Sequence, residues 1–203
     1  MFTLIRFAVV LVPMIASQIV RLHQHDAGSW ILWDYAGRFG GLAVLAAFPS
    51  ARTVAFRRDE RRISLWKIAL WIVGIVLVDL YPGRWVRQAI NTAFPITVLG
   101  AYPRPNGWLY FVDLIFGLAL VAASEEIVFR RCALHAFQPY LGKGRVFVLA
   151  SSALFGCYHW WAGLGNVVAG FVIGILLMLF LQRSIALWPV TLAHYLADIA
   201  DFS

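Results

Sequence analysis

The chain has 203 residues, of which 62% are apolar and 13% are charged, and its mean hydropathy is +0.77. Soluble domains contain about 25% charged residues, and one soluble core of this size could not bury so much apolar surface. The composition therefore excludes an ordinary soluble enzyme, a disordered chain and a coiled coil, and it predicts an integral membrane protein. The net charge of +7 is typical of membrane topology and lipid contact, and it does not indicate nucleic acid as a partner.

Seven apolar stretches approach the length of about 20 residues that a membrane-spanning helix needs. The predicted spans cover residues 2–20, 28–49, 65–81, 108–130, 146–161, 166–181 and 188–200. We interpret the first as a retained span, because no small-residue cleavage site follows it. Pro82 and Gly83 are expected to end the third span. The sequence thus predicts an all-α, polytopic transmembrane bundle of six or seven spans, with residues 1–107 and 108–200 in one integral membrane domain.

Residues 84–94 have the pattern of a helix that lies on a membrane rather than across it. Apolar side chains from Trp85 to Phe94 recur on one helical face, and Arg87 and Asn91 belong to the opposite face. This pattern predicts an interfacial helix in the membrane plane. The three prolines between positions 95 and 105 predict an irregular loop after it.

The positive charges are distributed unequally between the two sides of the predicted spans. With the amino terminus inside, 12 Lys and Arg residues fall inside, 4 fall outside and Arg38 lies within a span. The inside group includes the run from Arg52 to Lys67 and the pair Arg130 and Arg131. This asymmetry predicts a multi-pass protein with its amino terminus inside. The expected location is the cell membrane of a bacterium or archaeon.

Five ionisable residues lie within the predicted fourth, fifth and seventh spans. They are Glu125, Glu126, His159, His194 and Asp198. A charged group at the membrane centre costs roughly 2.5–3.5 kcal/mol on insertion scales. These side chains are therefore expected to converge on one another or on a water-filled cavity inside the bundle.

Helical spacing arranges these residues into short polar faces. Three pairs lie four positions apart and therefore share a helix face. The pairs are Glu126–Arg130, Phe155–His159 and His194–Asp198. Glu125 points about 100° away from Glu126. We expect an ion pair between Glu126 and Arg130, which leaves Glu125 free for a separate role.

The motifs Glu125-Glu126-x-x-x-Arg130, Phe155-x-x-x-His159 and His194-x-x-x-Asp198, in this order, resemble the CPBP family. These proteins are the CAAX proteases and bacteriocin-processing enzymes, also called Abi-type intramembrane proteases, and the resemblance covers residues 108–200. It implies a glutamic-type intramembrane endopeptidase that hydrolyses a peptide bond near the carboxy terminus or membrane segment of its substrate. Because the family includes type II CAAX prenyl endopeptidases, the implied partners are membrane lipid and a membrane-anchored or prenylated protein.

The resemblance also implies roles for individual residues. The implied catalytic residues are Glu125, His159, His194 and Asp198, with Glu126 and Arg130 in support. Glu125 would be the general base that activates water, and His159 would help to hold that water. His194 and Asp198 would stabilise the oxyanion, since amide hydrolysis needs an activated water and a hydrogen-bond donor. Many family members have Asn in place of Asp198; an ionised carboxylate cannot donate, so an alternative role for Asp198 is to orient His194.

Other interpretations of the same residues remain open. Two Glu, two His and one Asp have the donor types of a zinc site, although the spacing H-E-x-x-H is absent and neither a metal nor another cofactor is expected. A structural polar clamp would place the residues in a non-catalytic immunity or scaffold protein of the same fold. A transporter that relays protons would also use them, but the chain lacks recognisable repeated halves.

Three further expectations concern charged residues and their depth. Asp34 and Arg38 should pair within the second span, because they lie four positions apart. Asp79 and Asp113 should lie at the membrane interface. Measured from the predicted inner ends, Glu125 and His194 lie roughly 8–9 Å deep, whereas His159 lies nearer 20 Å. The fifth span is therefore expected to tilt, to start later or to be broken.

Overall fold

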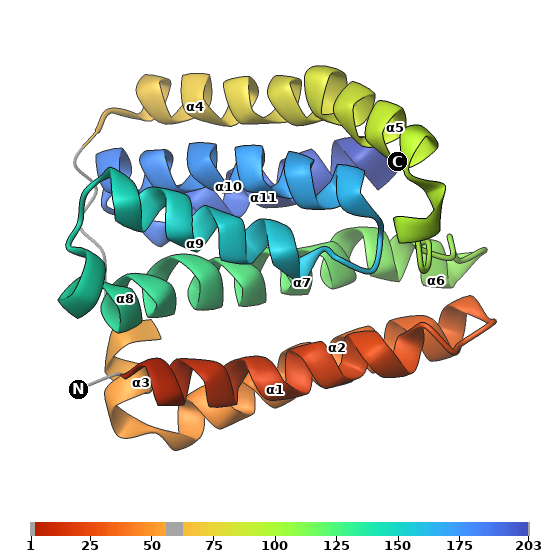
Figure 1. Cartoon of the computed structure of the whole chain (residues 1–203), viewed down its shortest axis with the longest axis horizontal. Helices are drawn as coiled ribbons and strands as arrows, with labels where there is room; N and C mark the ends of the chain where they lie inside the picture. The colour runs from red at the N-terminus through yellow and green to blue at the C-terminus, as the bar shows by residue number, and fades with distance from the viewer. Residues whose placement is uncertain (1–2, 56–62, 203) are drawn as a thin grey trace.

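The computed structural model describes residues 3–55 and 63–202, and within these ranges the chain is a bundle of helices without a β-strand. The long helices run along the long axis of the molecule in layers (Figure 1). Helices α1 (Leu4–Arg21) and α2 (Ala27–Ala47) form one outer layer, and α4 (Leu65–Val78) with α5 (Arg84–Ala93) forms the opposite one. The predicted all-α bundle is confirmed.

Helices α1 and α2 pack together as a close antiparallel pair. The side chain of Asp26 begins α2 by accepting a hydrogen bond from the backbone nitrogen of Ser29 over 2.8 Å. A Cβ atom added to Gly37 would lie 1.9 Å from Ser17 Oγ, so only glycine allows this approach of the two helices. The short helix α3 (Pro49–Ala55) follows α2 and ends where the described range 3–55 ends.

The helix that begins with α4 does not end at Pro82 and Gly83, so this expectation was wrong. It continues through the π-helical segment η1 (Asp79–Gly83) into α5. Proline lacks an amide hydrogen and its ring crowds the preceding turn. The wider π-helical turn accommodates it without ending the helix. The helix expected after the third span is present and packs against a later helix, but its position relative to a membrane stays a prediction.

The fourth predicted span is part of a longer continuous helix. Its segments are α6 (Trp108–Val112), the π-helical η3 (Asp113–Gly117), α7 (Leu118–Glu126), the π-helical η4 (Ile127–Cys132) and α8 (Ala133–Leu141). The expected end at Arg130 was therefore wrong. Arg130 and Arg131 are buried inside the bundle, and Arg131 Nη1 donates to the carbonyl oxygen of Ala55 over 2.9 Å. These two arginines do not belong to the group of inside loop charges.

The longer helix explains the apparent conflict in depth. Glu125 lies 16 residues before the end of α8, which is about 24 Å along the helix axis. Helix α9 (Arg145–Tyr158) ends just before His159, which lies 14 residues after its start, or about 21 Å. The two side chains therefore lie at similar distances from the same end of the bundle without a break in α9. The error came from the misplaced end of the fourth span.

The last two helices complete the bundle around the site. They are α10 (Leu164–Ser184) and α11 (Leu187–Phe202). Helices α9 and α10 lie very close, since a Cβ atom on Gly156 would lie 2.5 Å from the carbonyl oxygen of Val167. One apolar core joins α1, α2, η4, α8 and α9, and a second joins α4, α9, α10 and α11. Helix α9 contributes to both cores, with Phe147 and Val148 in the second and Phe155 and Tyr158, next to His159, in the first.

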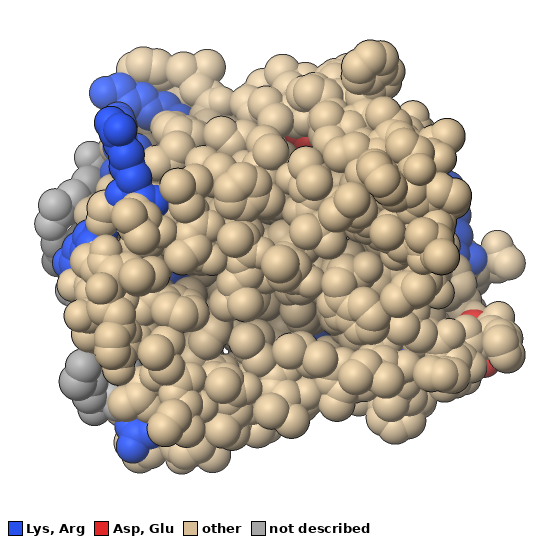
Figure 2. Space-filling model, in the orientation of Figure 1, with Lys and Arg blue, Asp and Glu red and all other residues tan. Residues whose placement is uncertain are grey.

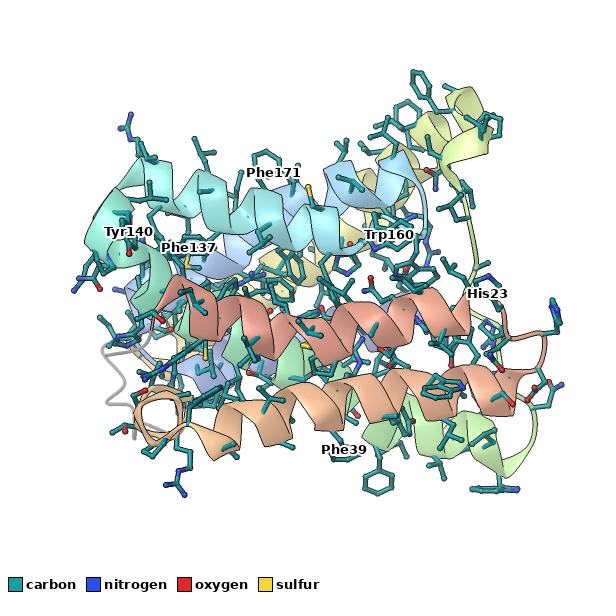
Figure 3. All side chains as sticks on the ribbon, turned by 60° about the horizontal axis from the view of Figure 1, so that its bottom comes forward. His23, Phe39, Phe137, Tyr140, Trp160 and Phe171 are labelled. Atoms are coloured by element: carbon teal, nitrogen blue, oxygen red, sulfur yellow. The ribbon has the colours of Figure 1, made fainter. Side chains whose placement is uncertain are left out.

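The surface has the character of a membrane protein. Among the described residues, the helices Leu4–Arg21, Leu65–Ala93 and Leu164–Ser184 are long and apolar enough to cross a membrane, and Arg145–Tyr158 is a shorter apolar helix. Figure 2 shows a broad uncharged face, with Lys and Arg gathered at the end where α4 begins. Phe39 points away from α2 and is 59% exposed (Figure 3). The number of spans and the inside amino terminus stay predictions, and Arg57, Arg58, Arg61 and Arg62 lie outside the described residues.

Candidate active site

The carboxylate of Glu125 lies at the centre of the polar cluster. It projects from the end of α7 and is 2% exposed. Its Oε1 atom accepts a hydrogen bond from Arg38 Nη1 over 2.8 Å. Its Oε2 atom lies 3.9 Å from the Nε2 atoms of both His159 and His194. The two carboxylate oxygens therefore have different surroundings, one held by an arginine and the other facing two imidazoles.

His159 is oriented by the helix that precedes it. It follows the last residue of α9, and its Nδ1 atom lies 2.9 Å from the carbonyl oxygen of Phe155. Because a carbonyl oxygen only accepts hydrogen bonds, Nδ1 carries the proton in this contact. The Nε2 atom of a neutral His159 then presents a lone pair toward Glu125. The spacing of Phe155 and His159 thus sets the tautomer through a backbone carbonyl.

His194 is hydrogen-bonded to Glu126. It lies on α11, and its Nδ1 atom is 2.9 Å from Glu126 Oε1, which accepts the proton of Nδ1. Its Nε2 atom lies 3.6 Å from Asp198 Oδ2, which is beyond hydrogen-bonding distance. The residue that orients the His194 ring in this structure is therefore Glu126. Asp198 contributes a nearby negative charge on the same helix face.

Glu126 and Arg130 form the expected buried ion pair. Arg130 Nε lies 3.1 Å from Glu126 Oε2, and both side chains are fully buried. The guanidinium of Arg130 also lies 4.3 Å from the centre of the Phe155 ring. The same ring contacts His159 and His194 at centroid distances of 4.9 and 5.7 Å. Phe155 therefore packs between the supporting ion pair and the two imidazoles.

Arg38 is one residue of the site that the sequence interpretation missed. The expected pair with Asp34 is confirmed at 2.8 Å, but Arg38 Nη1 also donates to Ser124 Oγ over 3.1 Å and to Glu125. Asp34 in turn pairs with Arg21. The sequence did indicate a charged pair, Asp34 and Arg38, within the second span. The spacing of these two residues does not show that Arg38 also contacts a residue on another helix. The first 107 residues thus contribute directly to the cluster.

These groups line one cavity of about 170 Å³ inside the bundle. Glu125, His159, His194 and Asp198 line it, whereas Glu126 and Arg130 lie behind its wall. This division agrees with the separate roles that the motifs imply for the two sets. From Glu125 the lining residues continue to Arg87 on α5 and to Asp201 and Phe202 at the end of α11. These segments lie at the bundle end away from the amino terminus (Figure 1).

The walls of this cavity contain aromatic and charged groups that the sequence did not assign to the site. Arg21 lies over the rings of Trp30 and Trp161, with its guanidinium carbon 4.3 and 4.7 Å from their centres. Such contacts stabilise a buried guanidinium through the negative face of each ring. Together with its ion pair to Asp34, they account for a charged residue at this position.

Asp79 and Asp113 also line the cavity and are buried inside the bundle, and their expected position at the membrane interface stays a prediction. Asp79 pairs with Arg87 over 2.7 Å. Asp113 accepts hydrogen bonds from the hydroxyl groups of Tyr35, over 2.6 Å, and Tyr102. Burial, together with the hydrogen bond to Asp113, raises the pKa of the Tyr102 hydroxyl above its ordinary range, so it stays a donor. Both carboxylates have internal partners, which allows their burial.

The polar cluster around Glu125 contains side chains of the types that bind metal ions. Within residues 3–55 and 63–202, no group of three or more His, Cys, Asp or Glu residues is arranged to hold a metal ion. The donor types around Glu125 are nevertheless those that zinc accepts. Metal dependence therefore stays open to experiment.

The fold and the cavity define a class of protein: a helical membrane protein with carboxylates and imidazoles gathered at depth. Comparison with known families then shows what this segment of the chain is similar to. Residues 106–200 match the family described as Rce1-like, type II CAAX prenyl endopeptidase Rce1-like. This match confirms the resemblance of the motifs: the matched segment, just under half of the chain, is similar to this family of CAAX proteases. Comparisons with curated proteins and with solved structures gave no match.

Proposed function

We propose that this protein is a CAAX-type intramembrane endopeptidase in which Glu125 activates the attacking water. The observation that carries the proposal is the position of Glu125 Oε2. Glu125 lines the cavity, its Oε2 atom lies 3.9 Å from two imidazole nitrogens, and none of the described groups donates a hydrogen bond to this oxygen. A buried carboxylate oxygen left available for a further partner suits a general base.

The neighbouring groups would place a water molecule for attack. Glu125 Oε2 and the lone pair on His159 Nε2 are both acceptors, so one water can donate a proton to each. A lone pair on the oxygen of that water is then free to attack a peptide carbonyl carbon. Glu125 takes one proton as the carbon–oxygen bond forms, while Arg38 holds the other carboxylate oxygen in place.

The developing oxyanion needs a donor, and His194, which lines the cavity and lies beside Glu125, can supply one. Its Nδ1 proton is engaged by Glu126, so donation from Nε2 requires the doubly protonated imidazolium. The carboxylates of Glu126 and Asp198 would compensate that positive charge. Glu125 then returns its proton to the leaving nitrogen as the carbon–nitrogen bond breaks, which yields a new carboxyl group and a free amine.

The proposed substrate is a membrane-anchored protein with a peptide bond near its carboxy terminus, as the description of the matching family implies. The cavity supports this proposal because it connects the polar cluster to one end of the bundle. A flexible chain end could enter there while its anchor remained in lipid. A prenylated anchor is the finer proposal, and an unprenylated anchor is the alternative to compare with it.

The test is cleavage of matched peptides by the purified protein in lipid vesicles. The peptides share one carboxy-terminal sequence, and the cysteine is prenylated, acylated or unmodified. Glu125→Gln should abolish cleavage while leaving folding intact, because it keeps the shape of the side chain and removes the base. His159→Ala should lose activity, whereas His23→Ala should not, since His23 is exposed between α1 and α2 (Figure 3). Cleavage at the wild-type rate by Glu125→Gln would refute the mechanism.

A further inference from the structure

Two arginines of α5 converge on a single carboxylate oxygen near the end of α11. Arg84 lies 3.1 Å through Nε and 2.9 Å through Nη2 from Asp201 Oδ1. Arg87 Nη2 lies 3.0 Å from the same oxygen, and Arg87 Nη1 donates to Asp79 Oδ1 over 2.7 Å. The guanidinium groups of Arg84 and Arg87 therefore form a site that already holds a carboxylate.

This arginine pair lies where the catalytic cavity meets the surface. Arg87 and Asp201 line the cavity that contains Glu125. Both also line a more open, polar pocket that includes Arg84. A chain end that passed from the outer pocket toward Glu125 would therefore pass the two guanidinium groups. Figure 1 shows α5 beside the carboxy terminus at this end of the bundle.

Another carboxylate could displace Asp201 from the two arginines with little loss of folding free energy. The side chain of Arg84 is 45% exposed and that of Asp201 is 25% exposed. Exposed ion pairs of this kind contribute little to stability, because water competes for both partners. Arg87 is more firmly placed, since its side chain is only 15% exposed and Asp79 holds its other end. Arg87, which would bind the carboxylate, is therefore held more firmly than Asp201, which occupies the site in this structure.

The distance between the arginine pair and the catalytic groups suits a short peptide. Seven positions separate His194 from Asp201 along α11, which corresponds to about 10 Å. An extended peptide advances about 3.3 Å per residue, so about three residues cover this distance. A substrate whose scissile bond lies at Glu125 would place its terminal carboxylate near Arg84 and Arg87.

We propose that Arg84 and Arg87 form the subsite for the terminal α-carboxylate of the substrate, and that Asp201 occupies this subsite in the free enzyme. The proposal rests on the proposed function as a carboxy-terminal endopeptidase. Guanidinium groups recognise carboxylates through several directed, charge-assisted hydrogen bonds. The subsite would make the enzyme selective for a free chain end and would set the cleavage point relative to that end.

The test compares two substrate peptides that differ only at the terminus, a free acid and the corresponding amide. Wild-type enzyme should cleave the acid with a kcat/KM at least about tenfold higher, as expected for a charge-assisted contact. Arg84→Gln and Arg87→Gln should bring the ratio of acid to amide close to one. The matched control Arg183→Gln should keep the wild-type ratio, because Arg183 is exposed at the far end of α10. Asp201→Asn should lower KM for the acid several-fold with little change in kcat.

The outcomes separate this inference from the function on which it rests. If wild-type enzyme cleaves neither peptide, the proposed protease function fails and the subsite fails with it. If wild-type enzyme cleaves acid and amide equally well, the function stands and the subsite is refuted. Retention of the wild-type ratio of acid to amide by Arg84→Gln also overturns the proposal. Because the Arg84 side chain is exposed, this variant tests the subsite even if Arg87→Gln unfolds. A Tm measured for each variant identifies such unfolding.

Discussion

Arg38 donates a hydrogen bond from Nη1 to Oε1 of Glu125 over 2.8 Å, although 87 positions separate the two residues in the sequence. Arg38 belongs to α2, outside the segment that matches the CAAX protease family. The carboxylate proposed as the base is therefore held by a helix that the family match does not cover. The amino-terminal helices are part of the site, and the matching segment alone would lack this contact.

The first prediction concerns this contact. Arg38→Ala would leave Asp34 and Glu125 as buried carboxylates without their common partner, which should cost about 3–5 kcal/mol of stability. Arg38→Lys keeps the charge but cannot reach both carboxylates in the same forked geometry. We expect Arg38→Lys to fold with a modest loss of Tm and to cleave at least about tenfold more slowly. Cleavage rates and thermal unfolding in detergent measure both effects, and wild-type activity in Arg38→Lys would contradict the proposed positioning role.

The second prediction separates the support of the site from its chemistry. Glu126 and Arg130 are completely buried, so Glu126→Ala leaves Arg130 without its ion-pair partner and Arg130→Ala leaves Glu126 with only His194, at a cost of about 3–5 kcal/mol. Glu126→Ala and Arg130→Ala should therefore lower Tm strongly. Glu125→Gln should lower it less, because Arg38 retains Asp34 as a partner. An equal loss of Tm in all three variants would show that the division between Glu125 and its supporting pair is wrong.

Local spacing explains why part of this site could be predicted from the sequence. The burial cost of charge indicated that Glu125 and the two histidines converge, and the four-residue spacing indicated the pair of Glu126 with Arg130. The hydrogen bond from His194 to Glu126 joins α11 to α7, so it depends on how the helices pack. No spacing along one helix encodes such a contact.

The ends of the helices were harder to predict for a different reason. A proline at position 82 normally ends a helix, and an arginine at position 130 normally marks the end of a span. In this chain a π-helical segment coincides with each position and the helix continues through both. The internal partners of Arg130 remove its need for water. Whether a charged residue finds such partners is a property of the folded bundle, so the end of the fourth span could not be read from hydropathy.

The third prediction uses two glycines as a matched pair. A Cβ atom on Gly156 would lie 2.5 Å from the carbonyl oxygen of Val167 and 2.9 Å from the backbone nitrogen of Phe171, so α9 and α10 would have to separate. Gly156→Ala should cost about 1–3 kcal/mol and reduce cleavage, because His159 lies three residues later. Gly74 in α4 has nothing within 4 Å of the corresponding position. Gly74→Ala should therefore leave activity unchanged and stabilise the helix by up to about 1 kcal/mol.

The measurements for this pair are Tm in detergent and the cleavage rate of one peptide. If any glycine-to-alanine change in these helices were harmful, Tm and the cleavage rate would fall in both Gly156→Ala and Gly74→Ala. The structure predicts a loss in Gly156→Ala alone. Equal behaviour of the two alanine variants would contradict the close packing of α9 and α10 around the site.

The last prediction distinguishes a glutamate mechanism from a zinc mechanism. A catalytic zinc would use several of Glu125, His159, His194 and Asp198 as ligands, so strong chelators would remove activity and added zinc would restore it. In the proposed mechanism Asp198 compensates charge without a direct hydrogen bond, since its Oδ2 atom lies 3.6 Å from His194 Nε2. Asp198→Asn should therefore retain part of the activity, and Asn adds an amide that can itself donate a hydrogen bond. As a zinc ligand, the same position would lose an anionic donor and release the metal. We expect no stoichiometric metal in the purified protein and no effect of chelators on cleavage. One zinc per chain by elemental analysis, lost together with activity in Asp198→Asn, would replace the glutamate mechanism with a zinc mechanism and leave the helical fold and its cavity as described.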